Sequence, residues 1–105
     1  INLSANSNYG HALRQFYDDF RGTVTRRTTL LVIGDGRSNY NPANAWVLGD
    51  LKRKARRVVW LCPEDRPSWG FGDSEMTNYA RAVSQVVTVQ SLGDLEKIAP
   101  QLVPR

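Results

Sequence analysis

The sequence predicts a three-layer α/β sandwich in which a small parallel sheet lies between helices. Short apolar runs alternate with longer segments whose apolar residues recur every three or four positions. This alternation gives the order α-β-α-β-α-β-α, and strands joined through helices of about ten residues form parallel sheets. In addition, the apolar run 28–34 stops abruptly at Asp35, which stands between two glycines. Open parallel sheets bind ligands beyond such carboxyl ends, so Asp35 marks a candidate site.

Length and composition limit the class of protein. The chain has 105 residues, a net charge of +4 and a single cysteine, Cys62. We therefore expect one domain without an internal disulfide, in a reducing, cytoplasmic setting. No apolar run approaches the roughly 18 residues that span a bilayer, and no signal-peptide pattern is present, so we expect no membrane association. The mild positive charge is compatible with nucleic acid but does not indicate it.

The first helix is predicted over residues 9–21, after a polar loop over residues 1–8. Ser7 or Asn8 can cap this helix, because their side-chain oxygens accept hydrogen bonds from free backbone amides. Apolar side chains at helical spacing form its inner stripe. These are Tyr9, Ala12, Leu13, Phe16, Tyr17 and Phe20.

The later elements continue the alternation. They are a helix over 43–56, a strand over 58–62, a helix over 74–83, a half-polar edge strand over 85–89 and a helix over 92–102. We expect Trp46 to lie in the core, and Leu92 and Leu95 to lie on the inner face of the last helix. Ser91 and Asp94 resemble a capping pair at the start of that helix.

The strand over residues 28–34 is as apolar as a central strand, which predicts burial on both faces. Three strands leave it with only one neighbour, and an open edge of this kind is an aggregation hazard. We therefore expect that the chain is the C-terminal half of a larger α/β domain whose other half supplies the missing neighbour. If the chain stands alone, we expect it to form a homodimer through this edge.

Three loops converge at one end of the predicted sheet, at residues 1–8, 35–42 and 63–73. They are rich in hydroxyls and carboxylates, the hard oxygen ligands that Mg²⁺, Ca²⁺ and Mn²⁺ prefer. Capping and turn formation account for most of these side chains, so the cluster alone does not identify a metal site. His11 is interpreted as an ordinary helix-surface histidine. The sequence contains no dinucleotide fingerprint, P-loop or nucleophile elbow.

Four segments carry a family resemblance. They read SNYGHAL at 7–13, LVIGDGRSNY at 31–40, VWLCPE at 59–64 and WGFGDSEM at 69–76. Together they resemble von Willebrand factor A (VWA) domains, and in particular the bacterial VWA-containing CoxE-like proteins. The similarity extends from about residue 4 to about residue 102, and it implies a Rossmann-like sheet.

The resemblance implies a metal-ion-dependent adhesion site (MIDAS), at which a divalent cation, usually Mg²⁺, bridges the domain to an acidic residue of a partner. Asp35 matches the later Asp of that site, and Ser7 occupies the position of its Thr. The family's Asp-x-Ser-x-Ser motif is absent from this chain, so we expect an incomplete site that binds the cation poorly or not at all. We expect Asn39, Trp69 and Asp73, on the neighbouring loops, to contact the partner.

The resemblance also implies an adaptor rather than an enzyme. Similar VWA domains are often encoded with MoxR-type AAA+ ATPases, and together they help to assemble or activate metalloenzymes. The residues themselves leave two alternatives open. A flavodoxin-like or receiver-like domain would use Asp35 to handle phosphate or a small ligand. A basic nucleic-acid binder would lose affinity steeply as the salt concentration rises.

Overall fold

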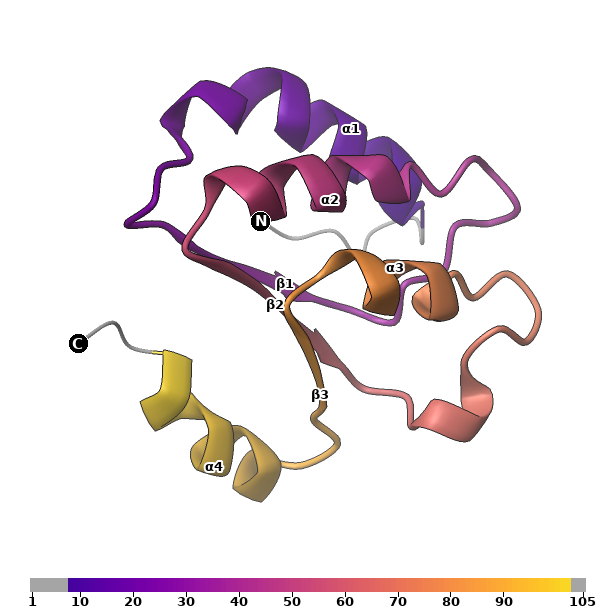
Figure 1. Cartoon of the computed structure of the whole chain (residues 1–105). Coiled ribbons are helices and arrows are strands. Elements are labelled where there is room, and N and C mark those ends of the chain that lie inside the picture. Colours follow the sequence, from indigo (N-terminus) through magenta and orange to yellow (C-terminus); the bar gives the residue numbers. More distant parts are fainter. Residues whose placement is uncertain (1–7, 103–105) are drawn as a thin grey trace.

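The computed structural model describes residues 8–102 and shows a three-stranded sheet with helices on both of its faces (Figure 1). The elements are α1 (Tyr9–Phe20), η1 (Arg21–Thr23), β1 (Thr29–Ile33), α2 (Ala45–Lys54), β2 (Arg57–Cys62), η2 (Arg66–Ser68), α3 (Met76–Ala82), β3 (Gln85–Thr88) and α4 (Leu92–Leu102). The predicted order of helices and strands is confirmed, with boundaries that differ by a few residues. Within residues 8–102, no helix is long and apolar enough to cross a membrane.

The sheet is parallel throughout, and its strands follow the order β1-β2-β3. In its register, Leu31 lies opposite Val59, and Leu61 lies opposite Val87. The central strand β2 is buried along almost its whole length. A helix connects each strand to the next parallel strand, so the α/β class predicted from the sequence is confirmed.

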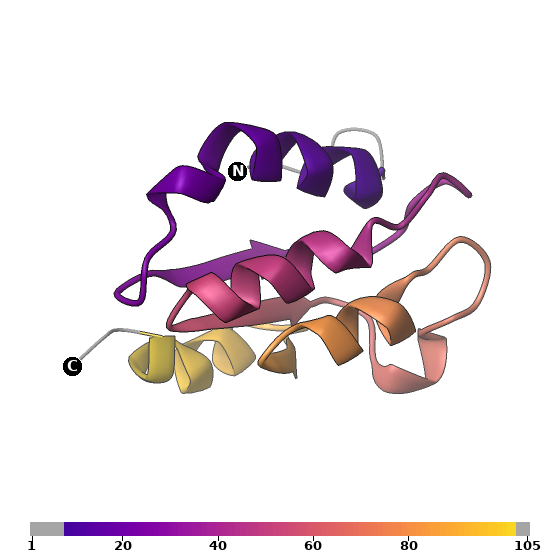
Figure 2. The same ribbon diagram turned by 45° about the horizontal axis from the view of Figure 1, so that its top comes forward.

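The main core lies on the face of the sheet that α1, α2 and α3 cover. These helices lie side by side in both views (Figures 1 and 2). Trp60 of β2 is fully buried at the centre of this face. Its ring stacks on Tyr79 of α3, with 4.8 Å between centroids, and lies 5.8 Å from the ring of Tyr9 of α1. One tryptophan thus joins two of the three helices to the sheet.

Of the elements in residues 8–102, only α4 packs on the opposite face, which is partly covered. Val59, Leu61 and Ile98 form a small second core there. On the neighbouring β1, Leu31 is 41% exposed and Ile33 is 61% exposed. The prediction that strand 28–34 is buried on both faces is therefore wrong. Its physical reason is that α4 packs over β2 and β3 and leaves β1 without a cover among the described residues.

Two predictions of core packing are also wrong. Trp46 is 49% exposed, because the buried stripe of α2 runs through Val47, Leu48 and Leu51 and places Trp46 toward α1 and solvent. There its ring forms a T-shaped pair with that of Tyr17, with 5.1 Å between the centroids. Leu92 and Leu95 of α4 are exposed as well, since the partly covered face offers them no partner layer.

The capping prediction for α4 is confirmed. The backbone amide of Asp94 donates to the hydroxyl of Ser91 over 3.1 Å. In return, the carboxylate of Asp94 accepts from the backbone amide of Gln90 over 3.0 Å. The first bond satisfies an amide that the first turn of the helix leaves open, and the second holds the residue before Ser91.

Candidate functional site

Asp35 leaves the sheet at a point fixed by two aromatic residues. The indole of Trp60 donates to the carbonyl of Gly34 over 2.8 Å. A Cβ atom at position 34 would lie 1.8 Å from the hydroxyl oxygen of Tyr9. A glycine is therefore required here, because any side chain would displace Tyr9 from the end of β1.

The second glycine of the motif fixes the chain on the other side of Asp35. Gly36 has a left-handed backbone (φ 72°), and a Cβ atom there would lie 2.4 Å from the sulfur of Met76. Its carbonyl accepts from the backbone amide of Glu75 over 2.9 Å. The Gly-Asp-Gly turn is thus tied to the residues that precede α3, and the position of Asp35 is set from both sides.

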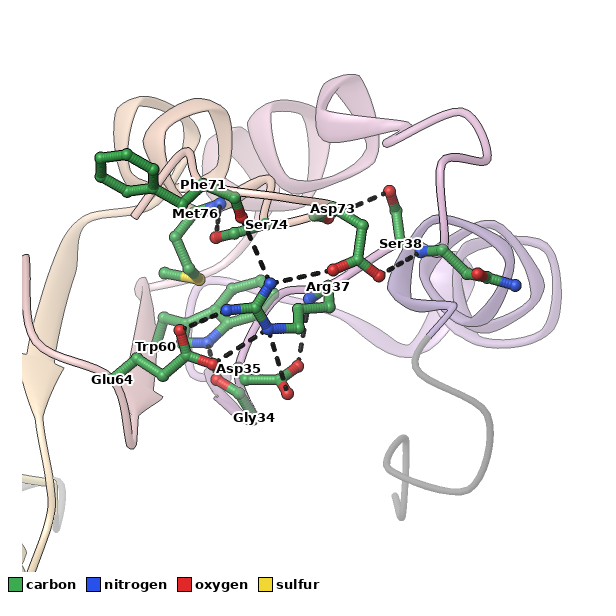
Figure 3. A network of polar contacts seen from close by, with 11 residues as sticks. Gly34, Asp35, Arg37, Ser38, Trp60, Glu64, Phe71, Asp73, Ser74 and Met76 are labelled. Atoms are coloured by element: carbon green, nitrogen blue, oxygen red, sulfur yellow. Dashed lines mark hydrogen bonds and ion pairs between the residues drawn. The ribbon is translucent and has the colours of Figure 1, made fainter. Parts of the chain in front are cut away.

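Arg37 joins the two loops that leave β1 and β2, in an arrangement that we call the Arg37 clasp: Arg37 with the carboxylates of Asp35, Glu64 and Asp73 (Figure 3). The guanidinium donates to both oxygens of Glu64, over 3.1 and 2.8 Å. It also donates to Asp73 over 2.9 Å. The fork geometry of arginine suits such bidentate pairing, and charged partners strengthen each hydrogen bond.

The four charged side chains of the clasp lie partly out of solvent, at 20% to 31% exposed. The hydrogen bond from Arg37 holds the pKa of Asp73 below its ordinary value. In the same way, the hydrogen bonds to Glu64 and then to Asp73 raise the pKa of Arg37. Both shifts favour the charged forms of Arg37 and Asp73. The clasp ties loop 35–42 to loop 63–73.

Asp73 also organises the backbone after Arg37. Its second carboxylate oxygen accepts from the amide of Asn39 over 3.0 Å, and its carbonyl accepts from the amide of the fully buried Ser38 over 3.0 Å. Asn39 and Tyr40 adopt left-handed backbone conformations, with φ of 53° and 59°. Asparagine tolerates this conformation, but it is strained for Tyr40, and such strain clusters at functional sites.

The N-terminus of α1 meets the same loop. Asn8 caps the helix, because its side-chain oxygen accepts from the backbone amide of His11 over 3.1 Å. The amide of Tyr9 donates to the carbonyl of Arg37 over 3.3 Å. The predicted cap is confirmed at Asn8, and the start of α1 lies beside loop 35–42, as expected. Ser7, the other predicted metal ligand, lies outside the described residues.

Two of the predicted partner-contact residues, Asn39 and Asp73, contact each other, and all three have structural contacts. The indole of Trp69 donates to the carbonyl of Glu64 over 2.9 Å and lies 5.1 Å from the guanidinium of Arg66. Asp73 belongs to the clasp, and the amide of Asn39 is bound to it. Their contact with a partner stays a prediction.

Sequence reasoning missed Arg37, the residue with the most polar contacts in the described site. A usable signal exists in the charges of the two loops. Residues 35–42 and 63–73 contain the acids Asp35, Glu64, Asp65 and Asp73, against the bases Arg37 and Arg66. An excess of acids that must converge at one sheet end calls for a cation among them.

The residues present provide one carboxylate for a metal ion. Within residues 8–102, no group of three or more His, Cys, Asp or Glu side chains is placed to hold one. Glu64 and Asp73 are occupied by Arg37. One oxygen of Asp35 accepts from the backbone amide of Arg37 over 3.1 Å, and the other lies 4.0 Å from its guanidinium. Asp35 therefore fits as a single ligand, and a cation site requires further ligands from outside the described residues.

The parallel sheet and its helices define an α/β domain. Its candidate site lies at the carboxyl ends of the strands, where Asp35 follows β1 and the Arg37 clasp holds the loops together. The chain matches the family model for the VWA domain containing CoxE-like protein over residues 2–98. Because the match covers nearly the whole chain, the protein belongs to this family of VWA domains. No curated protein and no solved structure matches it.

Proposed function

We propose that the chain is part of an adaptor domain that binds a protein partner through a divalent cation, with Mg²⁺ as the first candidate. The observation that supports this most is the setting of Asp35, which the Gly-Asp-Gly turn holds at the end of β1. One of its carboxylate oxygens accepts no hydrogen bond from residues 8–102. The CoxE-like VWA resemblance gives the same residue the role of a cation ligand. Ligands beyond residues 8–102 complete the site in this proposal.

A binding role, rather than a catalytic one, suits the chemistry of the described residues. Cys62 is buried in β2, and burial raises the pKa of its thiol, which makes it a poor nucleophile. Asp35 contacts a backbone amide and a guanidinium instead of a nucleophile that it could activate. A loop platform held by ion pairs loses little conformational entropy on binding, which favours recognition of a partner.

The proposed partner is a MoxR-type AAA+ ATPase in the cytoplasm, and the proposed process is the assembly or activation of a metalloenzyme. Both come from the resemblance to CoxE-like proteins that are encoded with such ATPases. In this proposal the VWA domain binds the ATPase through the cation, and the two act together on the metalloenzyme.

The test is a binding measurement between the protein that carries this chain and an immobilised MoxR-type ATPase, with Mg²⁺ or with EDTA. We expect binding in Mg²⁺ that EDTA abolishes, and at least tenfold weaker binding for Asp35→Asn. This variant keeps a side-chain oxygen for the amide of Arg37. Asp65→Asn is the matched control, because Asp65 lies on the neighbouring loop and bonds only locally, to Ser68. Binding that neither EDTA nor Asp35→Asn reduces would contradict the proposal.

A further inference from the structure

We propose that the chain binds the phosphate backbone of a nucleic-acid duplex, without reading its sequence, through a basic surface at the amino ends of β1 and β2. Two segments form this surface, which we call the basic end: residues 21–28, before β1, and residues 52–57, where α2 ends and β2 begins. They contain no acid and eight of the fourteen basic residues of the chain: Arg21, Arg26, Arg27, Lys52, Arg53, Lys54, Arg56 and Arg57. The basic end lies at the opposite end of the sheet from Asp35, so the proposal does not rest on the adaptor function.

The sheet brings the two basic segments together, although they are far apart in the sequence. Thr29 lies opposite Arg57 in the parallel register, and the backbone amide of Arg56 donates to the carbonyl of Thr28 over 2.8 Å. In both views the connection from η1 to β1 lies beside the connection from α2 to β2 (Figures 1 and 2). The net charge of the chain does not indicate a nucleic-acid site, but this convergence concentrates the charge on one surface.

The turn that carries Arg26 and Arg27 is held by its own polar groups. The amide of Thr28 donates to the carbonyl of Thr25 over 2.9 Å, and the amide of Thr25 donates to the hydroxyl of Thr28 over 3.0 Å. The amide of Arg27 donates to the hydroxyl of Thr25 over 3.2 Å. Both arginine side chains are exposed, and neither guanidinium has a hydrogen bond or an ion pair with residues 8–102. A fixed backbone thus presents two unpaired guanidinium groups to solvent.

The second segment adds two more unpaired bases. Asp50 pairs with Arg53 and Lys54, which neutralises part of the charge at the end of α2. Lys52 and Arg56 are exposed, and their side chains form no ion pair in the part of the chain that the structure describes. Four charged groups from two segments are therefore available to an anionic ligand.

The dipole of α2 does not account for the whole surface. Bases in the last turn of a helix complement its negative end, which explains the bases that end α2. Arg26 and Arg27 lie in the turn between η1 and β1 instead, at no end of an α-helix. Unpaired like charges that converge in this way repel one another, so their arrangement favours an anionic partner that relieves the repulsion.

The composition of the basic end favours duplex phosphates over other anions. Guanidinium groups bind phosphate oxygens in bidentate pairs, and protein–DNA interfaces are more polar and more positive than protein–protein interfaces, which have an apolar core. Single strands are held by stacking of their bases on aromatic rings. Among the large apolar side chains that are exposed in residues 8–102, only Phe20 adjoins the two segments, and its ring packs against that of Phe16.

The test is fluorescence anisotropy of a labelled DNA duplex titrated with the protein that carries this chain. EDTA is present throughout, because it removes the cation that the adaptor function requires. We expect the affinity to fall roughly a hundredfold between about 50 and about 200 mM salt, as about four phosphate contacts predict. A duplex of unrelated sequence should bind equally well. An RNA duplex distinguishes the two sources of the backbone, and tighter binding of either duplex supports contact through phosphate.

Two double variants test whether both segments take part. Arg26→Gln combined with Arg27→Gln removes the charges of the turn. Lys52→Gln combined with Arg56→Gln removes the unpaired charges of the second segment. Each should weaken binding about tenfold at low salt and reduce the salt slope by about 2, because each removes two phosphate contacts. These side chains have no polar partner within residues 8–102, so both variants should fold, which circular dichroism checks.

Arg66→Gln combined with Lys97→Gln is the matched control. It removes the same net charge from two exposed bases outside the basic end, on η2 and on α4. Its affinity and salt slope should equal those of the unchanged protein. If the control weakens binding as much as the other double variants, net charge rather than this surface is responsible, and the proposal fails.

Other outcomes also overturn the proposal. These are no binding at low salt, an affinity that does not change with salt, and a strong preference for one of two unrelated sequences. An effect of only one double variant would show that the two segments do not act as one surface. Tighter binding of phosphatidylserine vesicles or of polyglutamate than of either duplex would replace the nucleic acid by a membrane or an acidic protein.

Discussion

At the scale of the residue, Arg37 turns separate acids into one structure. Glu64 and Asp73 come from the loop that joins β2 to α3, and both would repel Asp35 without a cation among them (Figure 3). The guanidinium satisfies both oxygens of Glu64, one oxygen of Asp73 and the carbonyl of Phe71. The geometry of the carboxyl end of the sheet therefore depends on one side chain.

Replacing this side chain tests its contribution to stability. We expect Arg37→Met to lower the free energy of unfolding by about 1–3 kcal/mol, because it removes charged hydrogen bonds and leaves partly buried acids unpaired. Arg81→Met on α3 is the control, because Arg81 is exposed and its change should stay within about 0.5 kcal/mol. Urea unfolding monitored by tryptophan fluorescence gives both values. Equal effects of the two variants would show that the clasp adds nothing.

Sequence reasoning found Asp35 but not the clasp, because the signal for Asp35 lies within a few residues and the clasp joins residues far apart in the sequence. The signal for Asp35 is local: an apolar strand, a glycine turn and an acid follow one another within a few residues. The partners of Arg37 are 27 and 36 positions away in the chain. The pairing of β1 with β2 brings Glu64 to Arg37, and the contact of the β1 turn with the residues before α3 brings Asp73 there. Local spacing rules contain neither contact.

At the scale of the element, periodicity predicted each α-helix and strand of residues 8–102, but neither 3-10 helix and not every buried face. An apolar run gives β1 its strand conformation, yet Leu31 and Ile33 are exposed because burial depends on a covering layer. The same holds for Trp46, which lies one position away from the buried stripe of α2. Propensity and pattern are local quantities, whereas burial is a property of the assembled layers.

Two glycines in helices have different surroundings: Gly10 is closely packed and Gly49 is not. A Cβ atom at Gly10 of α1 would lie 1.8 Å from the carbonyl oxygen of Pro42, whereas one at Gly49 of α2 would meet no atom within 4 Å. We expect Gly10→Ala to destabilise the protein by roughly 1–3 kcal/mol through overpacking. Gly49→Ala should stabilise it by up to about 1 kcal/mol, because alanine favours a helix.

The measurement for both glycine variants is thermal or urea unfolding under identical conditions. The informative result is opposite signs for the same chemical change in two helices. A loss of stability in both variants would mean that the space around Gly49 is not open. A gain in both would mean that α1 can move away from Pro42 at little cost.

At the scale of the whole molecule, the sheet divides the protein into a well-covered half and a partly covered half. Three helices and Trp60 fill one face, while α4 covers part of the other. The polar clusters lie around the first half: the Arg37 clasp at the carboxyl end of the sheet, and Asp50 between α1 and α2. The hydroxyl of Tyr17 donates to Asp50 over 2.6 Å, and Arg53 pairs with the same carboxylate. Acid protonates carboxylates in both clusters over the same pH range.

We therefore expect the whole molecule to lose stability in acid. The hydrogen bond from Arg37 lowers the pKa of Asp73, and the hydrogen bond from Tyr17 lowers the pKa of Asp50. The unfolded state therefore binds protons more readily than the folded state near the ordinary value of 3.8. The stabilisation is complete above that pH and disappears as the pH falls through the lower pKa of the folded state.

Urea unfolding between pH 7 and pH 2, at one fixed protein concentration, measures this loss. Asp73→Asn should flatten the slope of the unfolding free energy below about pH 4, because it removes one carboxylate that must be protonated against its hydrogen bonds. Asp19→Asn is the control, since Asp19 is exposed on α1, and it should preserve the slope. If the unfolding free energy of Asp73→Asn falls with pH as steeply as that of the unchanged protein, the clasp is not a source of the acid sensitivity. Asp50 and its partners between α1 and α2 would then have to account for it.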